Sequence, residues 1–183
     1  MSGVLLLVVG PSGAGKDTLL AGARILLAPK GFVFPRRVIT RTGEAGGEDH
    51  VPATPEGFAR DKDRGDFALA WAAHGHDYGI PASIRDELAA GHHVVVNVSR
   101  TVVDTARRDF TRVGVVVMTA PRIVLTKRLK TRGREDAAAV ERRLARAVAY
   151  EVIGDDVIEV VNDGTIEEGI ARLATALETL TAR

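Results

Sequence analysis

Three glycines, a lysine and an aspartate stand close together near the start of the 183-residue chain. Gly10, Gly13 and Gly15 would let the backbone turn tightly with its N–H groups pointing inward, because glycine adopts conformations that other residues avoid. Lys16 adds a positive charge, and the helix expected to begin at Asp17 would direct its positive end to the same point. Such a nest of amides and charge is suited to hold the phosphates of a nucleotide.

The spacing of Gly10, Gly15 and Lys16 satisfies the P-loop pattern up to its last position, where Asp17 stands in place of Ser or Thr and Thr18 follows. The loop follows an unbroken apolar run over residues 4–9, which is typical of a strand buried on both faces. A glycine-rich turn into a capped helix would explain the glycines and Asp17. It would not explain the lysine beside them, so we expect a phosphate site.

Asp17 and Thr18 are also the candidates for holding Mg²⁺, directly or through water. No Asp ends the apolar run over residues 94–98, where many P-loop proteins keep a carboxylate for this ion. A carboxylate so close to nucleotide phosphates would be repelled unless a cation lay between them. The alternative is that Asp17 only complements the helix dipole, which is worth about 0.3 to 1 kcal/mol.

Two groups of basic residues are further candidates for phosphate chemistry. The first surrounds a short turn over residues 133–136 and could close over the nucleotide as a mobile lid. Its alternative is a solvated helical hairpin with weak arginine–carboxylate pairs. The second brackets a short apolar run and suggests recognition of an acceptor phosphate, or else a strand edge protected by charge. The first group is Lys130, Arg132, Arg134, Arg142, Arg143 and Arg146, and the second is Arg36, Arg37 and Arg41.

The elements that would position these residues alternate along the chain. Apolar runs predict strands over residues 4–9, 37–40, 93–98, 114–119 and 157–161. Helical patterns fall over residues 17–27, 55–64, 82–90, 102–110, 121–132, 136–151 and 165–180, the last with a capping-box signature. This alternation predicts an α/β fold with a parallel central sheet and helices on both faces. The loops after Val9, Thr40, Val98 and Thr119 should then converge around one cleft.

Composition excludes several classes of protein. A chain of this length, 45% hydrophobic, fits one domain, and its net charge of +1 gives no global attraction to nucleic acid. The absence of cysteine excludes disulfides, thiol catalysis and cysteine-based metal sites. The five histidines show neither zinc-ligand spacing nor a Ser-His-Asp order. With no signal peptide or membrane span in the pattern, we expect a soluble, cytoplasmic protein, and a homodimer is left open.

In these residues the chain resembles the guanylate-kinase-like P-loop kinases, and within them the ribose 1,5-bisphosphate phosphokinases. The resemblance lies in residues 10–17, 38–41, 45–50, 78–79, 94–100, 132–135 and 162–164. It implies a P-loop NTPase fold, ATP and Mg²⁺ as cofactors, and a small phosphorylated sugar as substrate. The implied reaction moves the γ-phosphoryl group of ATP onto the 1-phosphate of α-D-ribose 1,5-bisphosphate.

The resemblance also implies roles for single residues. Lys16 would bridge the β- and γ-phosphates, and Asn162 would lie near the adenine. The phosphate cradle would be Gly10, Pro11, Ser12, Gly13, Ala14, Gly15, Lys16, Asp17 and Thr18. The lid would contribute Arg132, Arg134 and Arg143, and the acceptor would meet Arg37, Arg41, Tyr78, Asn97, Ser99 and Arg100. The single domain would comprise a core (1–35, 82–125, 150–183), an acceptor-binding region (36–81) and a lid (126–149).

Departures from guanylate kinases themselves point away from GMP as acceptor. Those enzymes place two arginines three residues apart, and here Arg41 keeps the first while Glu44 occupies the second. They read guanine with a glutamate before a tryptophan, whereas Ala70 precedes Trp71 here and cannot accept a hydrogen bond. The acidic positions of the acceptor strand are replaced by Asn97 and Ser99. The alternatives are another small-molecule kinase of this fold, guanylate kinase foremost, and a non-catalytic binding module.

Overall fold

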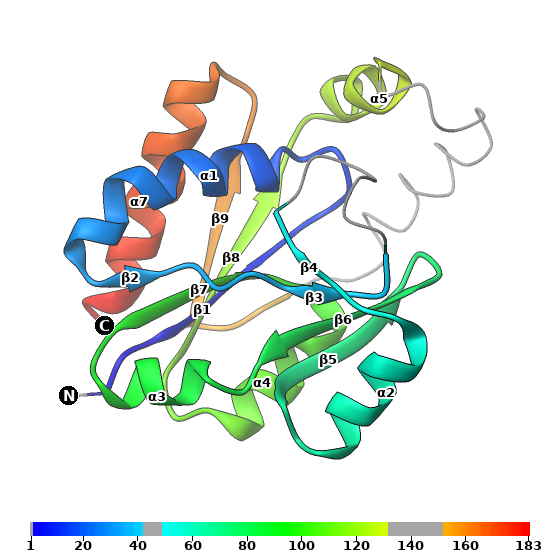
Figure 1. Ribbon diagram of the computed structural model, residues 1–183. Coiled ribbons are helices and arrows are strands. Elements are labelled where there is room, and N and C mark those ends of the chain that lie inside the picture. The colour runs from blue at the N-terminus through cyan, green and yellow to red at the C-terminus, as the bar shows by residue number, and fades with distance from the viewer. Residues whose placement is uncertain (1, 42–48, 132–151) are drawn as a thin grey trace.

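The computed structural model describes residues 2–41, 49–131 and 152–183 (Figure 1). Its strands are β1 (Leu5–Val9), β2 (Phe32–Val33), β3 (Val38–Ile39), β4 (Val51–Pro52), β5 (Phe67–Ala73), β6 (His76–Pro81), β7 (His93–Asn97), β8 (Val113–Thr119) and β9 (Val157–Val161). Its helices are α1 (Lys16–Leu27), η1 (Ala28–Lys30), α2 (Pro55–Asp63), α3 (Ile84–Ala89), η2 (Arg100–Val102), α4 (Val103–Asp109), α5 (Arg122–Thr131) and α7 (Ile166–Thr181).

The central sheet has five parallel strands in the order β2-β7-β1-β8-β9. Strand β1 lies in its middle, so its carboxyl end and those of β7 and β8 open at the same edge. The predicted parallel sheet is therefore confirmed, and the phosphate loop leaves it at the expected edge.

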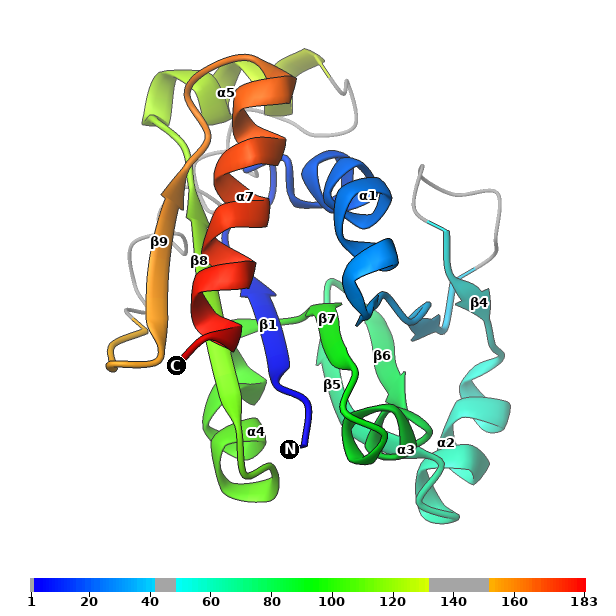
Figure 2. The same cartoon turned by 90° about the vertical axis from the view of Figure 1, so that its left-hand side faces the viewer.

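The side chains of β1 divide the core into two layers. Leu6 and Val8 pack with residues of α1 and α7, while Leu5 and Leu7 pack with residues of α3, α4 and the hairpin β5–β6. Figures 1 and 2 show α1 and α7 on one side of the central sheet and these other elements on the opposite side. Successive side chains of a strand point to opposite faces, so a strand covered on both sides must be apolar throughout. The structure thus confirms helices on both faces, and it adds a second sheet to one of them.

The second sheet has four strands in the order β4-β3-β6-β5. The prediction that residues 37–40 belong to the parallel sheet is wrong, because β3 pairs with β4 and β6 instead. One outer strand of the central sheet is β2, and Pro35 lies two residues after its end. Proline has no N–H for a ladder, so the chain leaves the central sheet there and can pair elsewhere.

The hairpin of β5 and β6 has no counterpart among the predicted elements, although the sequence carries a signal for it. Its two-residue turn is His74-Gly75, and both residues adopt positive φ (54° and 77°). Positive φ at both central residues is typical of the two-residue turns whose twist matches that of the flanking strands. A residue followed by glycine between two β-prone runs is the usual sequence of such a turn.

The observed helices otherwise follow the predicted ranges to within a few residues. Helix α7 begins with the expected capping box, in which Thr165 and Glu168 exchange hydrogen bonds with each other's backbone N–H. The predicted helix over residues 136–151 lies outside the described residues. Across residues 2–41, 49–131 and 152–183, no helix has the length and apolar character needed to span a membrane.

Candidate nucleotide and acceptor site

The phosphate loop connects β1 to α1 and owes its shape to three glycines. Gly10, Gly13 and Gly15 adopt positive φ angles of 149°, 88° and 89°. At Gly10 a side chain would also collide, because its Cβ would lie 2.2 Å from the carbonyl oxygen of Met118 on β8. The loop conformation is therefore set by the backbone, which any larger residue would disturb.

The ammonium group of Lys16 lies inside this loop. Its Nζ donates to the carbonyl oxygens of Gly10 at 2.7 Å and Pro11 at 2.9 Å. Lys16 is the first residue of α1, and its N-cap, Gly15, provides no side-chain cap. Helix N-termini attract anions through their N–H groups and dipole. The structure thus brings together the loop, the lysine and the helix start that the sequence predicts, in an arrangement that can bind phosphate.

Asp17 and Thr18 are exposed on the first turn of α1. The Oδ1 atom of Asp17 accepts a hydrogen bond of 2.7 Å from Nδ2 of Asn97, so the carboxylate faces the end of β7. A carboxylate beside a hydroxyl offers the hard oxygen ligands that Mg²⁺ prefers. No cluster of three or more His, Cys, Asp or Glu suited to a metal is found in the described part of the chain. Mg²⁺ at this point would need nucleotide phosphates and water to complete its shell, as is usual for this ion.

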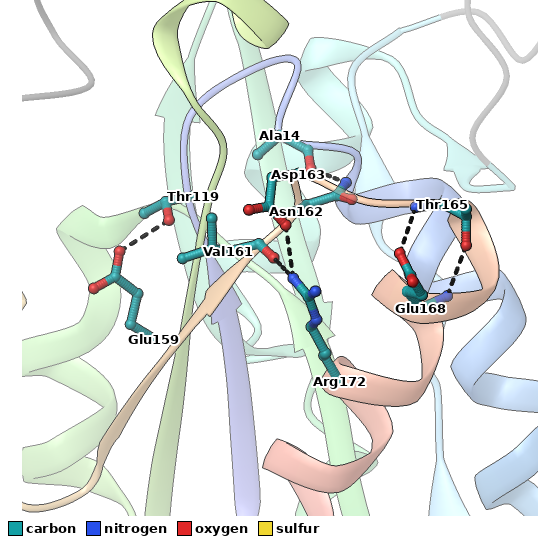
Figure 3. A network of polar contacts seen from close by, with 9 residues as sticks. All are labelled: Ala14, Thr119, Glu159, Val161, Asn162, Asp163, Thr165, Glu168 and Arg172. Atoms are coloured by element: carbon teal, nitrogen blue, oxygen red, sulfur yellow. Dashed lines mark hydrogen bonds and ion pairs between the residues drawn. The ribbon is translucent and has the colours of Figure 1, made fainter.

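Asn162 follows β9 and connects it to the phosphate loop. The residue is 4% exposed, and its Nδ2 donates to the carbonyl oxygen of Ala14 at 2.8 Å (Figure 3). Its backbone N–H donates to the carbonyl of Thr119 at 2.8 Å. A buried amide without a partner would cost about 1 to 3 kcal/mol. The side-chain amide therefore fixes the position of the loop, while its predicted nearness to adenine stays a prediction.

The segment that carries Asn162 is itself anchored by Arg172 of α7. Nη1 of Arg172 donates to the carbonyl oxygen of Val161 at 2.9 Å and to Oδ1 of Asp163 at 2.7 Å (Figure 3). The hydrogen bond from Arg172 holds the pKa of the Asp163 carboxyl below its usual value. Together with the capping box that follows, these contacts place Asn162 on a braced connection.

On the acceptor side, Arg37 and two aromatic rings form a cation–aromatic group. The guanidinium of Arg37 lies 5.3 Å from the ring centroid of Tyr78, and Nη1 donates to the carbonyl oxygen of Asn97 at 3.0 Å. Tyr78 is directly opposite Trp71 in the hairpin, and their rings stack at 5.4 Å and 6°. Arg37 thus joins the second sheet to the end of β7, where a phosphate could meet it.

Arg41 follows β3 in a turn that two imidazoles support. Nε2 of His50, which is 6% exposed, lies 3.3 Å from the carbonyl oxygen of Arg41. Nδ1 of His76 lies 2.9 Å from the carbonyl oxygen of Thr40, whose hydroxyl accepts from the backbone N–H of Asp77. Because a carbonyl only accepts, each of these ring nitrogens carries the proton. His50 and His76 are supporting residues that no local sequence pattern identifies.

Ser99 and Arg100 follow the end of β7 and differ in their surroundings. The hydroxyl of Ser99 caps η2 and accepts from the backbone N–H and the hydroxyl of Thr101. Partial burial lowers the pKa of the Arg100 guanidinium, which nevertheless stays charged at neutral pH. The contact of Arg100 with an acceptor phosphate stays a prediction, whereas the hydroxyl of Ser99 already supports a turn.

Most of the predicted lid, residues 132–149, lies outside the described residues. Arg132, Arg134 and Arg143, and also Glu44, lie outside the described residues. Their roles remain predictions. Of the described candidates, the structure groups Lys16, Asp17 and Asn97 at one edge of the central sheet, and Arg37 and Tyr78 adjoin that edge through Asn97.

Comparison with known proteins assigns the sequence to a family. The sequence matches the guanylate kinase family over residues 2–180. It is 45% identical over 182 residues to a Rhizobium etli protein named ribose 1,5-bisphosphate phosphokinase PhnN, covering 98% of this chain and 92% of that protein. It is 47% identical over 174 residues to a Roseobacter denitrificans protein named bifunctional ribose 1,5-bisphosphokinase-thymidine phosphorylase, covering 94% of this chain but 26% of that protein. This chain spans less than a third of the length of such bifunctional relatives.

The fold is shared with a solved structure, the guanylate kinase from Anaplasma phagocytophilum. The TM-score is 0.69 at 21% sequence identity, and the match covers 100% of this chain and 88% of that one. At this identity the likeness concerns the fold alone. The expected P-loop NTPase fold of the guanylate kinase type is thereby confirmed.

Proposed function

Because this chain belongs to the guanylate kinase family, we propose that it is an ATP-dependent kinase acting on α-D-ribose 1,5-bisphosphate. It transfers the γ-phosphoryl group to the 1-phosphate, giving 5-phospho-α-D-ribose 1-diphosphate and ADP. The observation that carries this proposal is the phosphate loop closed around the Lys16 ammonium, with Asn97 in contact both with Asp17 at the start of α1 and with Arg37 on the acceptor side. The name of the 45% identical Rhizobium etli relative supports the choice of acceptor.

The chemistry of the acceptor explains what the site must provide. A phosphate monoester has a second pKa of about 6, so the 1-phosphate is already an anion at neutral pH. One of its oxygens attacks the γ-phosphorus, the bond to the β–γ bridging oxygen breaks, and that electron pair leaves with ADP. No proton has to be removed from the attacking oxygen. Catalysis therefore depends on positioning and on neutralising charge.

The residues of the donor side divide these tasks. The amides of the loop orient the phosphates, and Lys16 places a positive charge where negative charge develops on the leaving oxygen. Asp17 and Thr18 are the residues that would hold Mg²⁺, which neutralises charge on the β- and γ-phosphates when it is bound with the nucleotide. We assign Arg132, Arg134 and Arg143 to closing over the transferred group.

The acceptor side selects a sugar phosphate over a nucleotide. Arg37 and Arg100 supply positive charge, and Arg41 stands on a braced turn. Ala70 lies on β5 directly opposite Gly79, so neither member of this pair has a side-chain oxygen for a guanine edge. A site that lacks such an acceptor loses much of its preference for the base. Guanylate kinase activity is the second candidate function and rests on the shared fold.

An ADP-release assay tests this proposal. The chain would be incubated with ATP and Mg²⁺, and with either α-D-ribose 1,5-bisphosphate or GMP at equal concentrations. We expect a kcat/KM for the sugar that exceeds the value for GMP by about 100-fold or more. A preference for GMP would assign the chain to guanylate kinase activity, and the absence of ATP binding in calorimetry would instead indicate a non-catalytic binding module.

A further inference from the structure

Asn97 and Asp17 form a contact that joins two elements far apart in the sequence. Nδ2 of Asn97, the last residue of β7, donates to Oδ1 of Asp17 in the first turn of α1 at 2.7 Å. The two residues are 80 positions apart. This distance is at the short end for an N–H···O hydrogen bond, as expected when the acceptor is a carboxylate.

Asn97 is well placed to act as the fixed member of this pair. It stands opposite Val8 in the parallel ladder, and the backbone N–H of Val98 donates to the carbonyl of Val8 at 3.1 Å. The carbonyl of Asn97 also accepts from Nη1 of Arg37 at 3.0 Å. Asp17, by contrast, is an exposed side chain on a helix surface. An exposed side chain adopts several rotamers, so one that must meet a ligand gains from a partner on a rigid element.

We propose that Asn97 is a positioning residue for Asp17. Its amide holds one carboxylate oxygen at the sheet edge, and the other oxygen would be the one that binds Mg²⁺ when the ion is present with the nucleotide. The residue type suits this task, because a carboxylate only accepts hydrogen bonds and an amide N–H donates without adding negative charge beside phosphates. An acidic side chain at position 97 would repel Asp17 instead. The inference rests on the proposed function in one respect, namely that the nucleotide binds together with Mg²⁺.

The contact also links the two sides of the site. Arg37 binds the backbone of the same residue whose side chain holds Asp17. A substitution of the Asn97 side chain removes the contact with Asp17 but leaves the backbone carbonyl that binds Arg37. It should therefore weaken the Mg²⁺-dependent part of nucleotide binding and leave the phosphate loop intact.

Calorimetric titration of the full chain with ADP, with and without Mg²⁺, measures how much Mg²⁺ contributes to nucleotide binding. For each variant, the dissociation constant of ADP without Mg²⁺ is divided by the one with Mg²⁺. No acceptor is present. The variants are Asp17→Asn, Asn97→Ala and the double variant. The matched control is Thr119→Val, which removes a strand-end hydroxyl whose partner is Glu159 on β9. Thermal unfolding shows that each variant folds.

We expect Mg²⁺ to tighten ADP binding by the wild-type chain, and the gain to fall about tenfold in Asn97→Ala and in Asp17→Asn. Affinity without Mg²⁺ should stay within about twofold, and Thr119→Val should resemble wild type. The double variant should be no worse than Asp17→Asn, because Asn97 acts through Asp17. The proposal would be overturned if the losses of the two single variants added up in the double variant. It would also be overturned if Mg²⁺ tightened ADP binding by either single variant as much as it does for the wild type.

This test separates the inference from the proposed acceptor. If ribose 1,5-bisphosphate is not phosphorylated but the pattern above is observed, the acceptor is wrong and the role of Asn97 stands. If ADP does not bind at all, both are wrong.

Discussion

The phosphate loop and the acceptor side use different means to present positive charge at one edge of the sheet. In the loop, three glycines in positive φ and one lysine occupy seven consecutive residues, and the backbone itself forms the site. On the acceptor side, Arg37, Tyr78 and Trp71 come from three strands or their flanks, and side chains make the contacts. A backbone site tolerates few substitutions, whereas a side-chain site can change its ligand one residue at a time. This difference is one reason why a single fold can keep its donor and change its acceptor.

The largest effect is expected from Lys16→Ala, which removes the one side-chain charge inside the loop. The kcat should fall by about 1,000-fold, because a cation directed at developing charge has no replacement there. Steady-state kinetics with saturating ATP and acceptor would measure this. Lys30→Ala is the matched control, since Lys30 pairs with Glu178 on the surface, and it should leave the rate unchanged. Full activity in Lys16→Ala would remove the loop from the mechanism.

Gly10→Ala tests whether the backbone shapes the donor side. We expect a loss of at least about 3 kcal/mol in the free energy of unfolding, or an open loop that no longer binds ATP, because strain at positive φ adds to the collision with Met118. Gly65→Ala is the matched control: Gly65 has a φ of 80°, but its Cβ would meet nothing within 4 Å. The control should lose about 1 kcal/mol in urea unfolding. Equal losses in the two variants would contradict the account of Gly10.

Arg37→Ala tests the role of a side-chain charge on the acceptor side. The KM for the sugar phosphate should rise by about 10- to 100-fold while the KM for ATP changes little, because a charged contact to the acceptor is lost. Arg36→Ala is an adjacent control, since Arg36 is exposed and lies 3.4 Å from Asp49. Initial rates at varied concentrations of each substrate measure both constants. If the two variants behave alike, Arg37 has no special place in the site.

A smaller effect, on the pH dependence of stability, is expected from His93, which lies outside both the phosphate loop and the acceptor side. Burial, with the nearby Arg112 and His92, lowers the pKa of His93, and its Nδ1 accepts from the backbone N–H of Val4. The unfolded chain therefore binds more protons than the folded one once the pH falls below about 6.5. The stabilisation from neutral His93 is present above that pH and is lost as the pH falls through the folded-state pKa.

Urea unfolding of the wild type at about pH 7 and about pH 5.5 would measure this loss. In His93→Gln the part of the pH dependence that comes from His93 should disappear, and kinase activity at neutral pH should be unaffected. An unchanged pH dependence in this variant would show that His93 does not carry the effect.

The donor side could be predicted because its signals are contiguous. A buried strand, three glycines, a lysine and a helix start follow one another, and each has a local physical reason. The capping box of α7 was predictable for the same cause, since Thr165 and Glu168 are three residues apart. Local rules of this kind do not depend on knowing which strands pair.

The acceptor side could be predicted only in part, because it depends on pairing between distant segments. A strand is present within residues 37–40, as expected, although it covers only Val38–Ile39. No local pattern says that β3 pairs with a hairpin and not with the central sheet. The contact of Asn162 with Ala14 spans 148 positions, and that of Asn97 with Asp17 spans 80. The type of each residue suggests a polar role, but only the assembled sheet edge shows which partner it meets.

In the proposed reaction a phosphoryl group passes from a triphosphate at the loop to an acceptor phosphate across the sheet edge. Phosphorus NMR of the protein with ATP, Mg²⁺ and α-D-ribose 1,5-bisphosphate follows this transfer itself. We expect the 1-phosphate signal to be replaced by the coupled pair of signals of a diphosphate at C1, in step with the formation of ADP. Release of inorganic phosphate with an unchanged 1-phosphate signal would contradict it.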